Sequence, residues 1–554
     1  MKRLLVPVLC LLFAAGCVNY DGGMFYATPS ATPAAEILPP PPELVIANKE
    51  GGILKLPMRS PATLNPILNG DATVDRILKL VFEPLTRLNE NFRPVANLAD
   101  VYVSYDCSFA VVTIRNDAMW HDGVPVTSDD FLYTLDAIAN APENSVYKKY
   151  AGKFSGAERI DSKTAQVYFS ERYGGSVYLF DFPLIPQHYY RGENNPSSVK
   201  NMSPLGNGLF VFEERVPFTS VIFKSNPYSF RTRPYVEFFE AVFIPDRETE
   251  LDAFDQGVTD VLFMEMTEWS RHRSVKQVHY GDCAAMYFEM IGFNFENPLL
   301  RNKLFRRAVA HMLDADEIIS SVYLSHAVRA LSPMHPASWL CAENLTEYEY
   351  NRELAGALVE RVRAGETLYE TERAQFITID DDEEEDGGDF FEGYVPPNVI
   401  TEFPVFKILV NEENAERIKT AQIIADAFGF QGLDAFLEIV PFEIFTEKII
   451  TGDYDLYVGG YTLGFIPYLK FIFTEHLFYD AYGLEEMLDG VTSAETEYDL
   501  LEAMEKLQSH VAEELPMISL AFLNMGVLAG TRVAGEIIPS FDDALANVNE
   551  WYVR

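Results

Sequence analysis

One stretch of twelve residues decides the local fold: Trp120-His121-Asp122-Gly123-Val124-Pro125-Val126-Thr127-Ser128-Asp129-Asp130-Phe131. Asp122-Gly123 is a dipeptide typical of a tight turn. Thr127, with Asp130 three positions later, has the pattern of a capping box and predicts a helix over residues 131–138. A Trp-His-Asp group can suggest catalysis, but turn and cap chemistry explains the same residues. We therefore interpret the stretch as structural and expect no catalytic residues in it.

Strand-like and helix-like segments alternate from Gly51 onward. Residues 53–56 have the pattern of a strand, and residues 75–82 that of an amphipathic helix that opens with acidic residues. This alternation predicts a mixed α/β protein. The chain has 554 residues, of which 48% are hydrophobic. At roughly 100 to 200 residues per domain, that length suggests three or four domain-sized units able to bury a large core.

The charge and the metal-ligating residues exclude several classes of function. The 83 acidic residues against 43 Lys and Arg give a formal net charge of -40. Such a surface repels phosphate backbones, and there is no dense basic run, so we expect no nucleic-acid partner. The nine His and five Cys show no CxxC, HxxxH or HExxH spacing. We therefore expect neither a metal site nor a cofactor.

The N-terminus, MKRLLVPVLCLLFAAGC at residues 1–17, has a basic start followed by an apolar run. This is the pattern of a secretory signal, and its end resembles the lipobox of bacterial lipoproteins. We expect residues 1–16 to be removed and Cys17 to carry lipid; the alternative is ordinary secretory cleavage with an incidental Cys. Residues 17–47 then form a lipidated, Pro- and Ala-rich tether. The expected location is outside the cell membrane, on its outer face or in the periplasm.

We assign no function to two further features, the acidic run and the cysteines of the mature chain. The acidic run at residues 380–392, DDDEEEDGGDFFE, predicts a solvated loop. A calcium site is the alternative, but consecutive carboxylates cannot all face one ion. Beyond Cys17, only Cys107, Cys283 and Cys341 remain in the mature chain, and three thiols cannot all pair. The protein is therefore no disulfide scaffold, although one pair stays possible.

Several separated segments together resemble the family 5 extracellular solute-binding proteins, the substrate receptors of ABC importers for oligopeptides, dipeptides, nickel chelates and some sugars. Besides residues 120–131, the segments that carry the resemblance are Ala62-Thr63-Leu64-Asn65-Pro66, Val81-Phe82-Glu83-Pro84-Leu85, Pro204-Leu205-Gly206-Asn207-Gly208-Leu209-Phe210, residues 303–314, Gly452-Asp453-Tyr454-Asp455-Leu456 and residues 514–520. The resemblance also predicts a helix over residues 415–430 and a strand over residues 436–440. Within residues 303–314, Leu304, Ala308 and Met312 form one helical stripe, and Arg306 and Arg307 are expected to face elsewhere.

The resemblance implies a two-lobed periplasmic-binding-protein fold of type II, cluster C-like, with an extra α/β domain inserted in the first lobe. Lobe I then comprises residues 48–87, 205–290 and 525–554, the extra domain residues 88–204, and lobe II residues 291–524. Ligand is expected in the cleft between the lobes, and closure of the hinge around it presents a surface to the permease.

The resemblance also suggests ligand-binding residues. Peptide-binding members carry a Trp, and an Asp that pairs with the ligand's α-ammonium, just after the strand that residues 452–456 match. Tyr461 stands at the place of the Trp, and residues 463–465 contain no acid. Unless another carboxylate replaces it, the protein should bind free di- and tripeptides poorly. Tyr461 and Phe465 are predicted to stack on ligand or to pack at the cleft edge, and Tyr147 and Asn65 are predicted near the cleft by analogy.

These observations predict a lipid-anchored, monomeric receptor that captures a small solute, foremost a peptide, and delivers it to an ABC permease with its ATPase subunits. One alternative is a receptor for a non-peptide solute, or for a signalling peptide, without coupling to transport. A more distant alternative is a surface hydrolase, but no G-x-S-x-G nucleophile motif is present. We therefore expect no enzyme.

Overall fold

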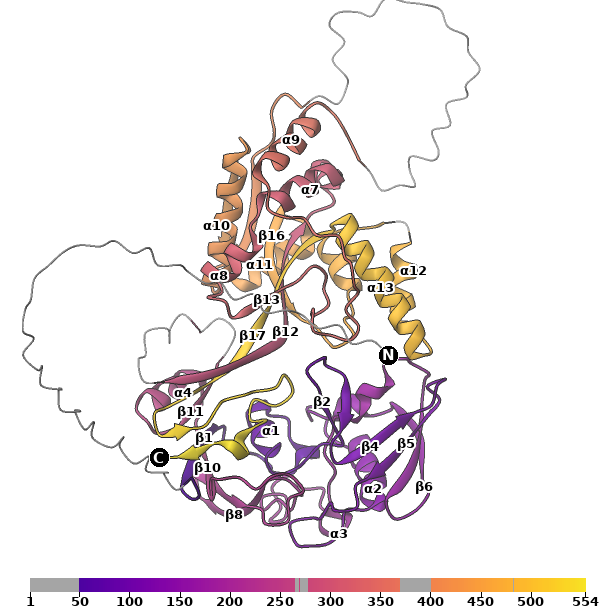
Figure 1. Ribbon diagram of the computed structural model, residues 1–554, viewed down its shortest axis with the longest axis vertical. Coiled ribbons are helices and arrows are strands. Elements are labelled where there is room, and N and C mark those ends of the chain that lie inside the picture. The colour runs from indigo at the N-terminus through magenta and orange to yellow at the C-terminus, as the bar shows by residue number, and fades with distance from the viewer. Residues whose placement is uncertain (1–48, 265–268, 270–277, 369–399, 482) are drawn as a thin grey trace, which may run out of the picture. The chain divides into compact units, whose positions relative to one another are not determined.

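The computed structural model describes residues 49–264, 269, 278–368, 400–481 and 483–554, and Figure 1 shows their helices and strands. Cys17, the tether and the acidic run at residues 380–392 lie outside the described residues. Within the part of the chain that the structure describes, no helix combines the length and the apolar character needed to cross a membrane.

Two four-stranded sheets form in the N-terminal half. The first has the order β1 (Ile53–Met58), β10 (Phe238–Phe243), β9 (Ser220–Ser225) and β8 (Phe210–Val216), with β1 parallel to β10 and the other pairs antiparallel. The second is antiparallel throughout, in the order β4 (Ala99–Val103), β5 (Phe109–Ile114), β7 (Thr164–Phe169) and β6 (Phe154–Arg159). Two short ribbons pair β2 (Thr86–Leu88) with β3 (Pro94–Ala96), and β18 (Val533–Ala534) with β19 (Tyr552–Val553).

A seven-stranded sheet contains the two longest strands of the described chain. Its order is β11 (Val261–Met264), β17 (Met517–Ala529), β12 (His279–Phe293), β16 (Leu456–Thr462), β14 (Phe406–Asn411) and β15 (Ala435–Val440), and β13 (Ala327–Arg329) also pairs with β17. β12 and β17 run antiparallel beside each other from the pair His279 and Ala529 to the pair Gly292 and Met517 (Figure 1). The expected lobe boundaries at 290/291 and 524/525 fall inside these two strands.

The helices divide into those that precede β12 in the chain and those that follow it. The helices before β12 are α1 (Ala72–Leu78), α2 (Ser128–Ala139), α3 (Gln187–Tyr190) and α4 (Arg247–Asp255). Those after β12 are α6 (Pro298–Arg301), α7 (Lys303–Met312), α8 (Ala315–Ser321), α9 (Arg352–Arg363), α10 (Ala415–Phe430), α11 (Phe442–Thr451), α12 (Leu484–Ser493) and α13 (Glu497–Glu514).

The buried apolar side chains form two large clusters. The first core draws on residues 54–263 and 527–551, and it includes side chains from both four-stranded sheets. The second core draws on residues 288–522. β17 contributes side chains to both cores, and β12 pairs with it from one core to the other with two shifts of register, so this pair of strands connects the two cores.

The turn-and-cap prediction for residues 120–131 is confirmed. The Trp120 and Gly123 backbones close the turn, with Gly123 at a φ of 84°, and Thr127 and Asp130 form the capping box at the start of α2. The buried Trp120 indole also donates to Asp130 at 3.2 Å. His121 hydrogen-bonds to the Gly206 and Gly208 backbones, and burial lowers its pKa to about 4. These contacts give the side chains of residues 120–131 a structural role.

One local prediction was wrong in its bounds. The helix expected over residues 75–82 is α1, which starts earlier because Asp71 caps it by accepting from the Thr73 and Val74 amides. The predicted α7 stripe of Leu304, Ala308 and Met312 is buried, and Arg306, which was expected to face elsewhere, is buried as well. Its guanidinium donates to the Leu300, Arg301 and Glu514 carbonyls, and these acceptors compensate for the loss of water.

Candidate functional site

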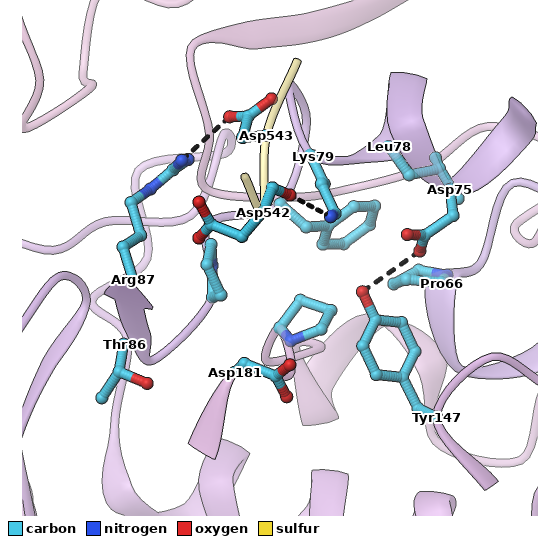
Figure 2. A pocket seen from close by; sticks show the side chains of 13 residues that line it. Pro66, Asp75, Leu78, Lys79, Thr86, Arg87, Tyr147, Asp181, Asp542 and Asp543 are labelled. Atoms are coloured by element: carbon cyan, nitrogen blue, oxygen red, sulfur yellow. Dashed lines mark hydrogen bonds and ion pairs between the residues drawn. The ribbon is translucent and has the colours of Figure 1, made fainter. Parts of the chain in front are cut away.

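A small cavity with a charged lining lies in the first core; we call it the acidic cavity (Figure 2). Its volume is about 40 Å³, room for one or a few water-sized groups. The charged side chains of its lining are Asp75, Lys79, Arg87, Asp181, Asp542 and Asp543. They come from α1, β2 and two segments far apart in the chain, so the tertiary fold assembles the cavity.

Tyr147 and Asp75 meet at one side of this cavity (Figure 2). The Tyr147 hydroxyl donates to Asp75 Oδ1 at 3.1 Å, and both side chains are buried. Burial raises the pKa of Asp75, and Lys79 and the Tyr147 hydrogen bond only partly oppose this. Burial, followed by the charge of Asp75, raises the pKa of Tyr147 well above its ordinary value. The pair is therefore an internal contact of the first core.

Arg87 organises the opposite side of the acidic cavity. Its guanidinium is 2.9 Å from Glu83 Oε2 and 2.8 Å from Asp543 Oδ2. Glu83, fully buried, also pairs with Arg231 at 3.3 Å. Burial alone would raise the pKa of Asp543, but Arg87 and Lys79 hold it below the ordinary range. Most of the charged side chains at this cavity thus already pair with other side chains of the protein.

A second cavity, which we call the groove, lies between segments of the two halves of the chain. Its volume is about 510 Å³, within the range of about 300 to 1,000 Å³ that is usual for ligand pockets. One wall consists of residues Ala151, Gly152, Lys153, Ser170, Glu171, Arg172, Tyr173, Gly175, Ser176, Tyr178 and Leu179; the other consists of Phe465, Ile466 and Thr492.

Stacked rings and hydrogen bonds join the two walls of the groove. The rings of Tyr178 and Phe465 stack, with centroids 5.1 Å apart and an interplanar angle of 8°. The Trp339 indole donates to the Tyr178 hydroxyl at 2.6 Å, and the Gly174 amide donates to the Ala494 carbonyl at 2.8 Å. Burial raises the pKa of Tyr178 to about 12, so its hydroxyl stays protonated at neutral pH.

An aromatic cluster places Phe465 close to both cavities. Phe465 packs edge-on against Phe541, at 5.2 Å between centroids, and lies 6.4 Å from Phe92. Phe541 directly precedes Asp542, which lines the acidic cavity, whereas Phe465 itself lines the groove. The segment after β16 therefore lines the groove and packs against the residue that precedes Asp542 of the acidic cavity.

The four predicted ligand residues do not meet at one place. Tyr147 lines the acidic cavity and Phe465 lines the groove. Asn65 is buried: its side-chain oxygen accepts from the Ile67 amide at 3.0 Å, and its amide donates to Asn201 at 2.9 Å. Tyr461 hydrogen-bonds through its hydroxyl to Tyr457 at 2.9 Å and to His476 at 2.7 Å, and burial raises its pKa to about 12.

Sequence reasoning missed most of the groove. Lys153, Tyr178 and Trp339 belong to no motif that was singled out, and only the tertiary fold brings them near Phe465. Among the described residues, no cluster of His, Cys, Asp or Glu could hold a metal ion. Cys107, Cys283 and Cys341 are all free thiols, which settles the open question of their pairing.

Comparison with known proteins identifies the family. Residues 93–474 match the family model described as bacterial extracellular solute-binding proteins, family 5 Middle. The chain belongs to this family. Family 5 proteins bind solutes outside the cytoplasm, and the family is defined by binding rather than by an enzymatic activity. The predicted family is thereby confirmed.

Relatives agree with this family over most of the chain. The oligopeptide-binding protein AppA of Bacillus subtilis is 21% identical over 517 residues, covering 89% of this chain and 90% of AppA. The crystal structure of the ABC transporter substrate-binding protein CtaP from Listeria monocytogenes is 19% identical, with a TM-score of 0.69, covering 91% of this chain and 100% of CtaP. The structure of B. subtilis AppA with a nonapeptide has a TM-score of 0.53 at 19% identity, covering 92% of this chain and 100% of AppA. The predicted mixed α/β, two-lobed fold of periplasmic binding proteins is confirmed.

Proposed function

We propose that this family 5 protein is the peptide-binding receptor of an ABC importer. It captures a peptide between its two lobes and delivers it to a membrane permease, which works with ATPase subunits. The names of its relatives support a peptide ligand: AppA and OppA of B. subtilis are both oligopeptide-binding proteins, and AppA was solved with a nonapeptide.

The pairing of β12 with β17 is the observation that carries this proposal. β17 has side chains in both cores, and β12 pairs with it along this length, with register shifts between Ala284 and Tyr287 and again between Glu289 and Met290. Such irregularities bend a strand and strengthen its twist. Two cores joined by a bent pair of strands can close around a ligand by a hinge motion.

We assign lobe I to residues 48–87, 205–290 and 525–554, the extra domain to residues 88–204, and lobe II to residues 291–524. The two cores support the division between lobes, since β17 has Met517 and Phe522 in the second core and Val527 and Ala529 in the first. Within the cleft, we assign direct ligand contact to Phe465, and a supporting role to Tyr147, whose buried hydroxyl donates to Asp75. Tyr461 and Asn65 support the same surfaces through the hydrogen bonds described above.

We further propose that the protein acts outside the cell membrane as a lipid-anchored monomer without enzymatic activity. The signal-like N-terminus and the lipobox-like sequence that ends at Cys17 support export and anchoring. Replacing Cys17 with Ser should move the protein from the membrane fraction to the soluble fraction. An unchanged distribution after fractionation of the cells would contradict the anchor.

A thermal-shift titration tests the receptor function directly. A synthetic nonapeptide library should raise the melting temperature in a concentration-dependent manner, since a ligand that binds only the folded state stabilises it. Free amino acids of the same composition are the control and should leave it unchanged. Mass spectrometry after incubation should recover the peptides intact. Absence of any shift would contradict peptide binding, and cleaved peptides would indicate an enzyme.

A further inference from the structure

We propose that the turn between β2 and β3, residues 89–93, is a latch that holds the two lobes closed before a peptide binds. The inference rests on the proposed function, because it concerns the closure by which such a receptor takes its ligand. In our assignment the turn belongs to the extra domain, whereas the side chains that surround it come from lobe II and from lobe I. Its contacts therefore cross the boundaries that must separate when the lobes open.

The backbone of this turn is fixed by Asn89. The side-chain oxygen of Asn89 accepts from the amides of Asn91 at 3.0 Å and Arg93 at 2.9 Å. The turn places Phe92 at a φ of 57°, in the left-handed region that favours glycine. A bulky residue persists in such a conformation only where its surroundings hold it there. The contacts of the Phe92 side chain must therefore offset this strain.

The Phe92 ring packs against side chains of both lobes. It lies edge-on to His335 of lobe II, at 4.8 Å between centroids, and edge-on to Phe541 of lobe I at 5.7 Å. Its centroid is 6.4 Å from that of Phe465, which also belongs to lobe II. Phe92 is only 5% exposed, so separation of the lobes would transfer much of its ring to water. The loss of this apolar burial opposes opening.

Polar contacts join the same turn to lobe II. The Trp339 amide donates to the Asn91 carbonyl at 3.0 Å, and the Asn91 side-chain amide donates to the Ala337 carbonyl at 3.2 Å. Arg93 pairs with Glu497 at 2.6 Å, and its guanidinium lies 4.5 Å from the centroid of the Trp339 ring. All of these contacts join groups of this chain, so the latch needs no ligand to form.

The latch leaves room for a peptide beside it. Tyr178, which lines the groove of about 510 Å³, donates through its hydroxyl to the Phe92 carbonyl at 2.9 Å. None of residues 89–93 lines the groove itself. The latched state is therefore also the state that binds a peptide, and the latch raises its population. Removal of the latch should weaken peptide binding rather than strengthen it.

Small-angle X-ray scattering tests the latch on protein freed of ligand by unfolding, dialysis and refolding. The wild type should keep its radius of gyration when a nonapeptide is added, because the latch already closes the lobes. Phe92→Gly removes the ring and suits the left-handed backbone. Without peptide it should have a larger radius, and saturating nonapeptide should restore the wild-type value. A wild-type radius in ligand-free Phe92→Gly, or compaction of the wild type on addition of peptide, would overturn the latch.

Phe218→Gly is the matched control. Phe218 has a φ of 63° in the turn between β8 and β9, but it is 96% exposed. The substitution relieves a similar backbone conformation without removing a contact between the lobes, so the radius of gyration should stay that of the wild type. An equal increase in both glycine variants would show that the Phe92 ring does not close the lobes.

Arg93→Gln tests the polar contacts while the Phe92 ring stays in place, and it decides the question alone if Phe92→Gly does not fold. It should increase the ligand-free radius by less than Phe92→Gly does. Calorimetry should show nonapeptide affinity weakened about tenfold in Phe92→Gly, and about twofold to threefold in Arg93→Gln. Wild-type radii and affinities in the folded variants would overturn the proposal. Failure of the wild type to bind any peptide would instead overturn the proposed function, and the ligand-free radii would still decide the latch.

Discussion

The charged side chains of the acidic cavity pair within the protein, whereas a charged side chain of the groove is exposed to solvent. In the acidic cavity, Arg87 is engaged by two buried carboxylates and Asp75 by the Tyr147 hydroxyl, within about 40 Å³. In the groove, Lys153 is exposed beside a space of about 510 Å³. Buried charges need partners within the protein, whereas charges at an open cavity stay available for a ligand. We therefore expect the first region to contribute to the stability of the fold, and we propose the second as the region open to a ligand.

Substitution of Arg87 should have the largest effect. Arg87→Met leaves Glu83 and Asp543 buried without their common partner, and such a loss typically costs about 3 to 5 kcal/mol. Urea unfolding should show this decrease in the free energy of unfolding. Lys153→Met, the matched change at the groove, should leave stability within about 0.5 kcal/mol of the wild type. Equal stability of both variants would remove the distinction between the two regions.

The pH dependence of the free energy of unfolding should show that Asp75, unlike a surface carboxylate, has a raised pKa in the folded protein. Because burial raises its pKa in the folded protein above the ordinary 3.8, the folded state holds the proton more tightly than the unfolded state. Its contribution is therefore lost as the pH rises from about 3.8 through the folded pKa.

Asp75→Asn keeps an acceptor for the Tyr147 hydroxyl but cannot ionise. The difference in unfolding free energy, variant minus wild type, should increase as the pH rises across this window. Denaturant titrations at a series of pH values measure it. A difference that stays constant or decreases with rising pH would show that Asp75 is not penalised by burial.

Blocking the ligand's amino end should have a small effect. Residues 463–465 contain no acid, and Glu171, the carboxylate in the groove lining that includes Phe465, is exposed. N-acetylated tripeptides should therefore bind at least as tightly as free tripeptides, within about threefold by calorimetry. Tight binding of the free peptides that disappears on acetylation would show that another carboxylate of the protein replaces the missing Asp.

Deletion of residues 380–392 should have the smallest effect. Their clustered carboxylates repel one another and offer little apolar surface to bury, in contrast to Glu83 and Asp543. The deletion variant should keep its melting temperature within a few degrees and its peptide affinity. A collapse of either property would show that this segment packs against the protein or coordinates an ion.

Local sequence patterns predicted much of the fold, because the residues that interact in a turn, a cap or a helix lie close together in the chain. The capping box of Thr127 and Asp130 spans three residues, and α10 has the bounds that were expected. The family motifs then supplied the order of the segments.

Long-range contacts could not be predicted in the same way. Arg87 and Asp543 are 456 residues apart, and Trp339 meets Tyr178 across 161 residues. Arg306 was expected outside the apolar stripe, but carbonyl oxygens at the ends of other segments accept its hydrogen bonds. The aromatic residue Tyr461 was recognised, yet nothing local to it indicated the hydrogen bond of its hydroxyl to His476.

Native mass spectrometry of the purified full-length protein, followed by identification of the ligand it releases, tests the central claim most directly. Peptide binders with a closing cleft often retain cargo during purification. We predict a population of protein with bound peptides that are intact after release, and exchange of these for an added nonapeptide. Release of a non-peptide solute, with no exchange for added peptide, would contradict a peptide receptor.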